Sequence, residues 1–112
     1  MGLDLTIREQ TNFRTDDKGR TTWTTVELYN MRNCWEVLNE LGNKLENGFS
    51  NCSTVSFEAV EFLNVLNTLK EELKYDKDNR DLKYEIEELE DFIKQEDITE
   101  DTERAFEVHA WW

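Results

Sequence analysis

The chain of 112 residues has no proline, four glycines and one histidine. Because no turn or helix boundary can depend on the fixed φ angle of proline, we expect long, uninterrupted elements. The glycines stand far apart, which excludes a glycine-rich phosphate-binding loop. A single histidine offers little material for a zinc site or a histidine-based catalytic set. These scarcities argue against several common kinds of active site.

The two cysteines, Cys34 and Cys52, stand eighteen positions apart, a spacing that matches no metal-binding or redox motif. We expect two free thiols in a reducing compartment, although the spacing leaves a disulfide open. No apolar run approaches the length of a membrane span, and the N-terminus lacks a basic segment followed by an apolar one. We therefore expect a soluble intracellular protein with no membrane partner.

Basic residues are also scarce: 13 of them stand against 26 acidic residues, which gives a formal net charge of −13. Residues 1–70 carry a net charge of −3 and residues 71–112 carry −10. Direct binding to nucleic acid or to anionic lipid needs a basic surface, so neither is expected. A partner protein with a basic surface would be attracted instead.

Alternating apolar and polar residues predict three strands in a single domain that spans residues 1–112. The first strand covers Leu3–Phe13 and the second covers Thr21–Tyr29, with a turn between them. The last strand covers Ala105–Trp112 and should join the N-terminal hairpin. The sequence therefore predicts a three-stranded antiparallel sheet built from both termini.

Helical spacing of apolar residues predicts three helices that pack on this sheet, giving an α+β fold. The first helix should cover Asn30–Glu46, followed by a polar loop from Phe49 to Val55. Ser56 is the expected N-cap of a second helix over Phe57–Tyr75. The third helix should begin at Asp81 and return antiparallel to the second.

The stretch from Asp81 to Glu103 combines an apolar ladder with dense negative charge. The steps of four, three and four residues put the ladder on one stripe of a helix. This stripe should face the core, with the acidic residues on the opposite, solvent-exposed face. The ladder consists of Leu82, Ile86, Leu89 and Ile93.

The acidic face is the leading candidate for function. Duplex DNA carries about one negative charge per 1.7 Å of its axis, and a helix rising about 1.5 Å per residue with a carboxylate at every second position approaches that density. The face is thus a candidate nucleic-acid mimic or docking surface for a basic protein; the alternative is a solvated face that only adds solubility. The predicted partner-binding residues are Glu85, Glu87, Glu88, Glu90, Asp91, Glu96, Asp97, Glu100, Asp101 and Trp111.

Aromatic residues suggest a second hypothesis. The last strand places Trp111 and Trp112 on opposite faces, so Trp111 should be partly exposed, near Trp23 or Tyr29. Exposed aromatic rings can stack on nucleobases, which makes the chain a candidate nucleotide-binding or sponge protein. The alternative is that these rings cover the sheet or a homodimer seam. The predicted ligand-binding residues are Trp23, Tyr29, His109 and Trp111.

No catalytic residues are predicted. The strand pattern places His109 beside Glu107 and Trp111, with no nucleophile in view. The run from Asp76 to Asp78 lacks the glycine and the later glutamate of a calcium-binding loop. We therefore expect a non-enzymatic protein without a metal site or a cofactor.

Four short pieces of the chain match a known pattern: Met1–Leu5, Tyr29–Trp35, Cys52–Leu69 and Phe106–Trp112. Together they resemble a diffuse set of small bacteriophage proteins. Those proteins open with a Met-Gly-Leu-Asp strand, continue with a helical middle and close on a Trp-ended strand. The Trp-Arg pair often seen in their first helix is absent here. The resemblance implies a phage origin and an α+β fold, and no activity.

Taken together, the acidic face and the resemblance favour one function. The chain is expected to be a phage interaction protein that acts in the host cytoplasm. It would bind and inhibit a host protein, either a defence protein or one that handles nucleic acid.

Overall fold

The computed structural model describes residues 2–43 and 45–112. Met1, which opens the resemblance, and Lys44, inside the predicted first helix, lie outside the described residues. The fold is α+β, as predicted, with three helices and one antiparallel sheet. Its elements in chain order are β1 (Asp4–Thr15), β2 (Thr21–Arg32), α1 (Trp35–Gly42), β3 (Ser53–Glu58), α2 (Ala59–Tyr75), α3 (Arg80–Gln95) and β4 (Ala105–Trp111).

The sheet has four strands in the order β2-β1-β4-β3, so the prediction of three strands is wrong by one. The missed strand, β3, contains Ser56, the predicted N-cap, and pairs along its length with β4. This edge strand is short and half of its residues are polar, so its sequence resembles that of a loop. The actual N-cap of α2 is Glu58, which forms a capping box with Glu61.

The first helix is much shorter than predicted, because β2 continues to Arg32. Met31 lies opposite Leu5 in the sheet and is fully buried there. The apolar residues of this segment fit helical spacing almost as well as strand alternation. Pairing with β1 therefore decides the conformation, and local sequence does not.

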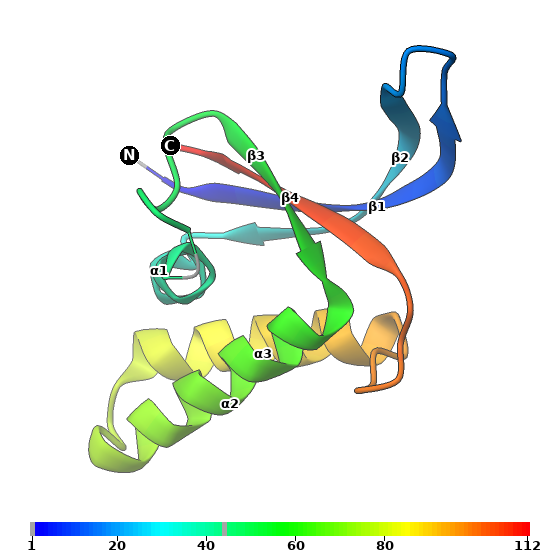
Figure 1. Ribbon diagram of the computed structural model, residues 1–112. Coiled ribbons are helices and arrows are strands. Elements are labelled where there is room, and N and C mark those ends of the chain that lie inside the picture. The colour runs from blue at the N-terminus through cyan, green and yellow to red at the C-terminus, as the bar shows by residue number, and fades with distance from the viewer. Residues whose placement is uncertain (1, 44) are drawn as a thin grey trace.

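All three helices cover one face of the sheet, called the inner face (Figure 1). Three phenylalanine rings join this face to the helices: Phe62 of α2, Phe92 of α3 and Phe106 of β4. Their centroids lie 5.2 to 5.9 Å apart in edge-to-face contacts, and all three are fully buried. Edge-to-face packing is a favourable arrangement of aromatic rings, so this triad holds the two layers together.

A β-bulge in β2 interrupts the regular alternation of side chains between the two faces of the sheet. Ile7 pairs with Tyr29 and Arg8 with Glu27, which leaves Leu28 as the extra residue. Tyr29 therefore lies on the inner face, whereas Trp23 keeps to the outer face. Without the bulge, regular strand alternation would put these two aromatic residues on the same face.

Beyond Gln10, β1 no longer pairs with β4, and the β1–β2 hairpin projects as a two-stranded arm. The arm rises on the side of the sheet opposite the helices (Figure 1). Where it leaves the sheet, Glu107 is 7% exposed and accepts hydrogen bonds from the Trp23 indole (3.1 Å), Gln10 (3.3 Å) and Arg8 (3.4 Å). This polar cluster anchors the arm to the outer face.

Candidate partner-binding site

The predicted acidic face lies on α3 and the loop that follows it. Asn79 caps the helix, because its side chain accepts a hydrogen bond from the Leu82 backbone N–H at 3.0 Å. Three of the four predicted ladder residues are buried as expected, but Ile93 is only partly buried and Phe92 takes the central position. The inward face of α3 consists of Leu82, Glu85, Ile86, Leu89 and Phe92.

Glu85 is the main departure from the predicted exposed face, because its side chain is only 3% exposed. Its Oε1 accepts hydrogen bonds from the backbone N–H groups of Glu36 (2.8 Å) and Val37 (3.0 Å) at the start of α1. A carboxylate from α3 thus caps a neighbouring helix that has no cap of its own. Glu85 therefore supports the fold and does not belong to the exposed acidic face.

The environment of Glu85 changes its acidity. Burial raises the pKa of Glu85 to about 7, outweighing the two backbone hydrogen bonds, which lower it. The nearby charges of Glu36 and Asp81 raise the pKa further. The same surroundings act on Cys34, whose buried thiol has its pKa raised to about 12.

Glu88 and Asp91 both contact the hydroxyl of Tyr29 at 2.7 Å. Burial and these carboxylates raise the pKa of Tyr29, so the phenol keeps its proton. A phenol has one hydrogen to donate, and the two carboxylates share it. Glu88 is partly buried by this contact, whereas Asp91 stays exposed.

Glu96 is held at the C-terminal end of α3 by Arg104. The Arg104 guanidinium donates to both Glu9 oxygens at 2.9 and 3.0 Å and to Glu96 Oε1 at 2.7 Å. The hydrogen bond from Arg104 holds the pKa of Glu96 below its usual range. Arg104 also lies over the Phe106 ring, 5.1 Å from its centroid. This arrangement ties α3 to β1 and β4.

The carboxylates of the predicted face therefore fall into two sets. The inward set, whose side chains bind other parts of the fold, consists of Glu85, Glu88 and Glu96. Asp91 belongs to neither set, since it is exposed and also accepts the Tyr29 hydrogen bond. The outward set, whose side chains are exposed, consists of Glu87, Glu90, Asp97, Glu100 and Asp101.

Within the described residues, only Glu90 of the outward set has a side-chain partner, an exposed ion pair with Lys70 at 3.2 Å. Several of these residues border a groove of about 610 Å³ between α2, α3 and the loop after α3. Leu66, Ile93 and Ile98 give this groove an apolar base. Three members of the outward set, Glu87, Glu90 and Asp97, thus form an acidic rim on this apolar depression, and Lys94 lies on the same rim.

Trp111 is 56% exposed, as predicted, but it lies on the outer face of the sheet, away from α3. Its neighbour Trp112 packs partly buried against Trp35, with ring centroids 5.9 Å apart. The expectation that Trp111 lies near Trp23 or Tyr29 is wrong. Trp111 is next to Asp4 in the sheet, and Trp23 lies where the arm begins.

The structure does not bring the four predicted ligand-binding residues together. Tyr29 lies on the inner face, packed on Phe92 with ring centroids 5.7 Å apart. Trp23, His109 and Trp111 lie on the outer face, where His109 Nδ1 is 2.7 Å from the Thr54 hydroxyl. No described pocket contains more than one of the four residues.

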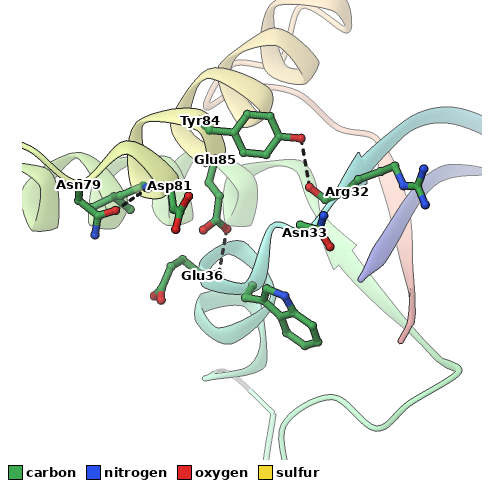
Figure 2. Close-up of a pocket in the computed structure, with 9 residues that line it drawn as sticks. Arg32, Asn33, Glu36, Asn79, Asp81, Tyr84 and Glu85 are labelled. Carbon is green, nitrogen blue, oxygen red and sulfur yellow. Dashed lines mark hydrogen bonds between the residues drawn. The ribbon is translucent and has the colours of Figure 1, made fainter. Parts of the chain in front are cut away.

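Sequence reasoning missed a pocket of about 560 Å³ between the end of β2, the start of α1 and the first turns of α3. Figure 2 shows Tyr84 and Glu85 of α3 facing Arg32 and Glu36 across this space. The Tyr84 hydroxyl donates to the Arg32 carbonyl at 3.1 Å. A helical-wheel count would have placed Glu85 on the inward stripe, three residues after Leu82, but its partners come from elsewhere in the chain.

Other kinds of site find little support in the parts of the chain that the structure describes. There, no group of three or more histidine, cysteine or acidic side chains could hold a metal ion. Cys34 is buried, Cys52 is exposed, and both thiols are free, as predicted. No described helix is long and apolar enough to cross a lipid bilayer.

Comparisons with protein-family models, curated proteins and solved structures find no match to this chain.

Proposed function

We propose that this chain is a non-enzymatic interaction protein that binds a basic surface of another protein through the outward set. The observation that carries this proposal is the exposed acidic rim around the groove between α2 and α3. An apolar centre with a polar rim is the usual composition of a protein–protein interface. The partner would supply apolar side chains to the groove and basic ones to the rim.

Charge distribution supports the same proposal. Residues 71–112 carry −10 of the net −13, so the side of the molecule that holds the outward set attracts cationic surfaces. Since Glu85, Glu88 and Glu96 are engaged within the fold, the exposed charges are more widely spaced than those of the whole stretch. The proposal therefore rests on attraction to a basic surface and less on imitation of duplex spacing.

The partner that we propose is a host protein, acting in defence or handling nucleic acid, that a phage-encoded chain would inhibit. Enzymes and binding proteins of this kind carry basic surfaces that hold nucleic acid. An acidic protein docked on such a surface would compete with the nucleic acid. The resemblance to small phage proteins supplies the reason to look for the partner in a bacterial host.

The test uses two triple charge reversals that change the net charge equally. One variant changes Glu87, Glu90 and Asp97, which line the groove, to lysine. The control variant changes Asp17, Glu27 and Glu46, which are exposed elsewhere, to lysine. Proteins captured from bacterial lysate by the wild type and by the control should be lost with the first variant. The affinity of a captured protein should fall steeply as salt rises, since exposed charges are screened.

Two results would contradict the proposal. One is equal capture by both triple variants, which would make the position of the charges irrelevant. The other is an affinity that does not change between low and high salt. Unfolding curves of both variants show that each is folded before either result is interpreted.

A further inference from the structure

The pocket at the start of α3 combines aromatic walls with carboxylates. Trp35 and Tyr84 line it and are 39% and 41% exposed, so parts of both rings are open to a ligand. Glu36, Asp81 and Glu85 line it as well. Figure 2 shows the carboxylates of Glu85 and Asp81 directed into the space between α3 and α1.

Glu85 has spare capacity to accept a hydrogen bond. Both of its bonds to the start of α1 use Oε1, and within the described residues nothing donates to Oε2. No fully buried side-chain oxygen or nitrogen of the described residues lacks a partner. Oε2 is therefore not fully enclosed, and it belongs to the carboxylate that Figure 2 shows directed into the pocket. A side chain that is 97% removed from solvent thus aims one unused acceptor into the cavity.

Aromatic faces beside carboxylates recognise cations. An ammonium or guanidinium group is attracted to the electron-rich face of Trp or Tyr, and carboxylates accept its hydrogen bonds. The one basic residue on the wall, Arg32, is already paired with Asp4 at 3.3 Å. Glu36, Asp81 and Glu85 line the same pocket and repel one another when charged, so a bound cation would relieve an unfavourable interaction among them.

We propose that this pocket binds one cationic side chain, an arginine or a lysine, of the basic partner. The inference rests on the proposed function and adds a second contact to it. At about 1.5 Å per residue, the pocket at Asp81 lies roughly 20 Å along α3 from the C-terminal part of the outward set. A partner surface would therefore have to present basic residues at both places. Arginine is the better fit, because its planar guanidinium can stack on a ring and donate to a carboxylate together.

The test is a titration with N-acetyl-L-arginine methylamide, followed by the four tryptophan indole signals in ¹H–¹⁵N NMR spectra. The Trp35 signal, assigned with a Trp35→Phe variant, should shift with the probe, whereas those of Trp23 and Trp111 should not. The uncharged citrulline analogue should bind at least about tenfold more weakly, because it lacks the cationic charge. Glu36→Gln and Asp81→Asn should each weaken binding by about threefold, and Glu87→Gln, outside the pocket, should leave it unchanged.

A Trp35 signal that does not move at high probe concentration would overturn the inference, as would an equal shift with the citrulline analogue. The two proposals fail separately. If partner capture depends on the outward set while the Trp35 signal ignores the probe, only the pocket is wrong. If the Trp35 signal responds while both triple variants capture the same proteins, the pocket stands and the proposed docking surface is wrong.

Discussion

The inward and outward sets of carboxylates lie within the same short stretch and are indistinguishable by residue type. Glu85 is 3% exposed and caps α1, whereas Glu87, two positions later, is exposed and has no side-chain partner among the described residues. Position on the helix explains the difference, because Glu85 lies between Leu82 and Leu89 on the inward stripe. Negative charge in a sequence therefore does not measure negative charge on a surface.

The largest expected difference between the sets is in stability. Glu85→Ala should lower the free energy of unfolding by about 2–4 kcal/mol, since two backbone N–H groups lose their acceptor and a buried side chain is removed. Glu87→Ala, the matched control, should change it by less than about 0.5 kcal/mol. Urea unfolding monitored by tryptophan fluorescence measures both. Equal effects would show that Glu85 does not act as a cap.

The second expected difference is in pH dependence. Because the pKa of Glu85 is raised to about 7, the folded protein holds this proton where the unfolded chain has released it. Glu85 thus contributes a loss of stability as the pH rises from about 5 to about 8, of up to about 3 kcal/mol. Glu85→Gln keeps an oxygen acceptor but does not titrate, so its stability relative to the wild type should increase over this range. A constant difference between the two proteins at pH 5 and pH 8 would contradict this prediction.

The third expected difference is between two basic residues: Arg104, which binds Glu96 of the inward set, and Lys94, which is exposed. Arg104→Ala should lower the free energy of unfolding by about 1–3 kcal/mol, because Glu96 and Glu9 lose hydrogen bonds from a charged donor. Lys94→Ala is the control, since Lys94 is exposed and should matter by less than about 0.5 kcal/mol. Thermal unfolding at one pH compares the two variants directly. A similar loss in both would mean that Arg104 does not join α3 to the sheet.

The smallest expected effect belongs to Tyr29. Tyr29→Phe removes the hydroxyl shared by Glu88 and Asp91 and should cost about 1 kcal/mol, since both carboxylates remain accessible to water. Tyr75→Phe, at a site that is 90% exposed, should cost nothing measurable. Urea unfolding resolves the difference. If Tyr29→Phe left the free energy of unfolding unchanged, the hydrogen bond from Tyr29 would not stabilise the fold, and Glu88 would not belong to the inward set.

The sequence predicts the α+β class, the N-terminal hairpin, the last strand and the two long helices, because each has a clear apolar period. It misses β3, whose residues alternate too weakly, and it extends α1 backwards over the end of β2. Both errors concern segments whose conformation depends on strand partners elsewhere in the chain. The sequence does not predict the bulge at Leu28 for the same reason, and this bulge places Tyr29 on the other face of the sheet.

The candidate site is predicted in part. The sequence locates the acidic stretch correctly. The prediction that every carboxylate is exposed is wrong, because the helical spacing that places the apolar residues inward was not applied to the acidic residues. Helical position alone would have flagged Glu85 and Phe92 as inward. It could not have identified the N–H groups of α1 that donate to Glu85, because those depend on how two helices pack. The groove and the pocket also arise only from tertiary packing.

The division of the acidic residues is tested most directly by carboxyl labelling of the native protein with carbodiimide and an amine, read by mass spectrometry. Glu87, Glu100 and Asp101 should be labelled rapidly, and Glu85, which is 3% exposed, far more slowly in the folded protein. Glu96, held by Arg104, should be slow. Labelling of Glu85 at the rate of Glu87 in the folded protein would contradict the account.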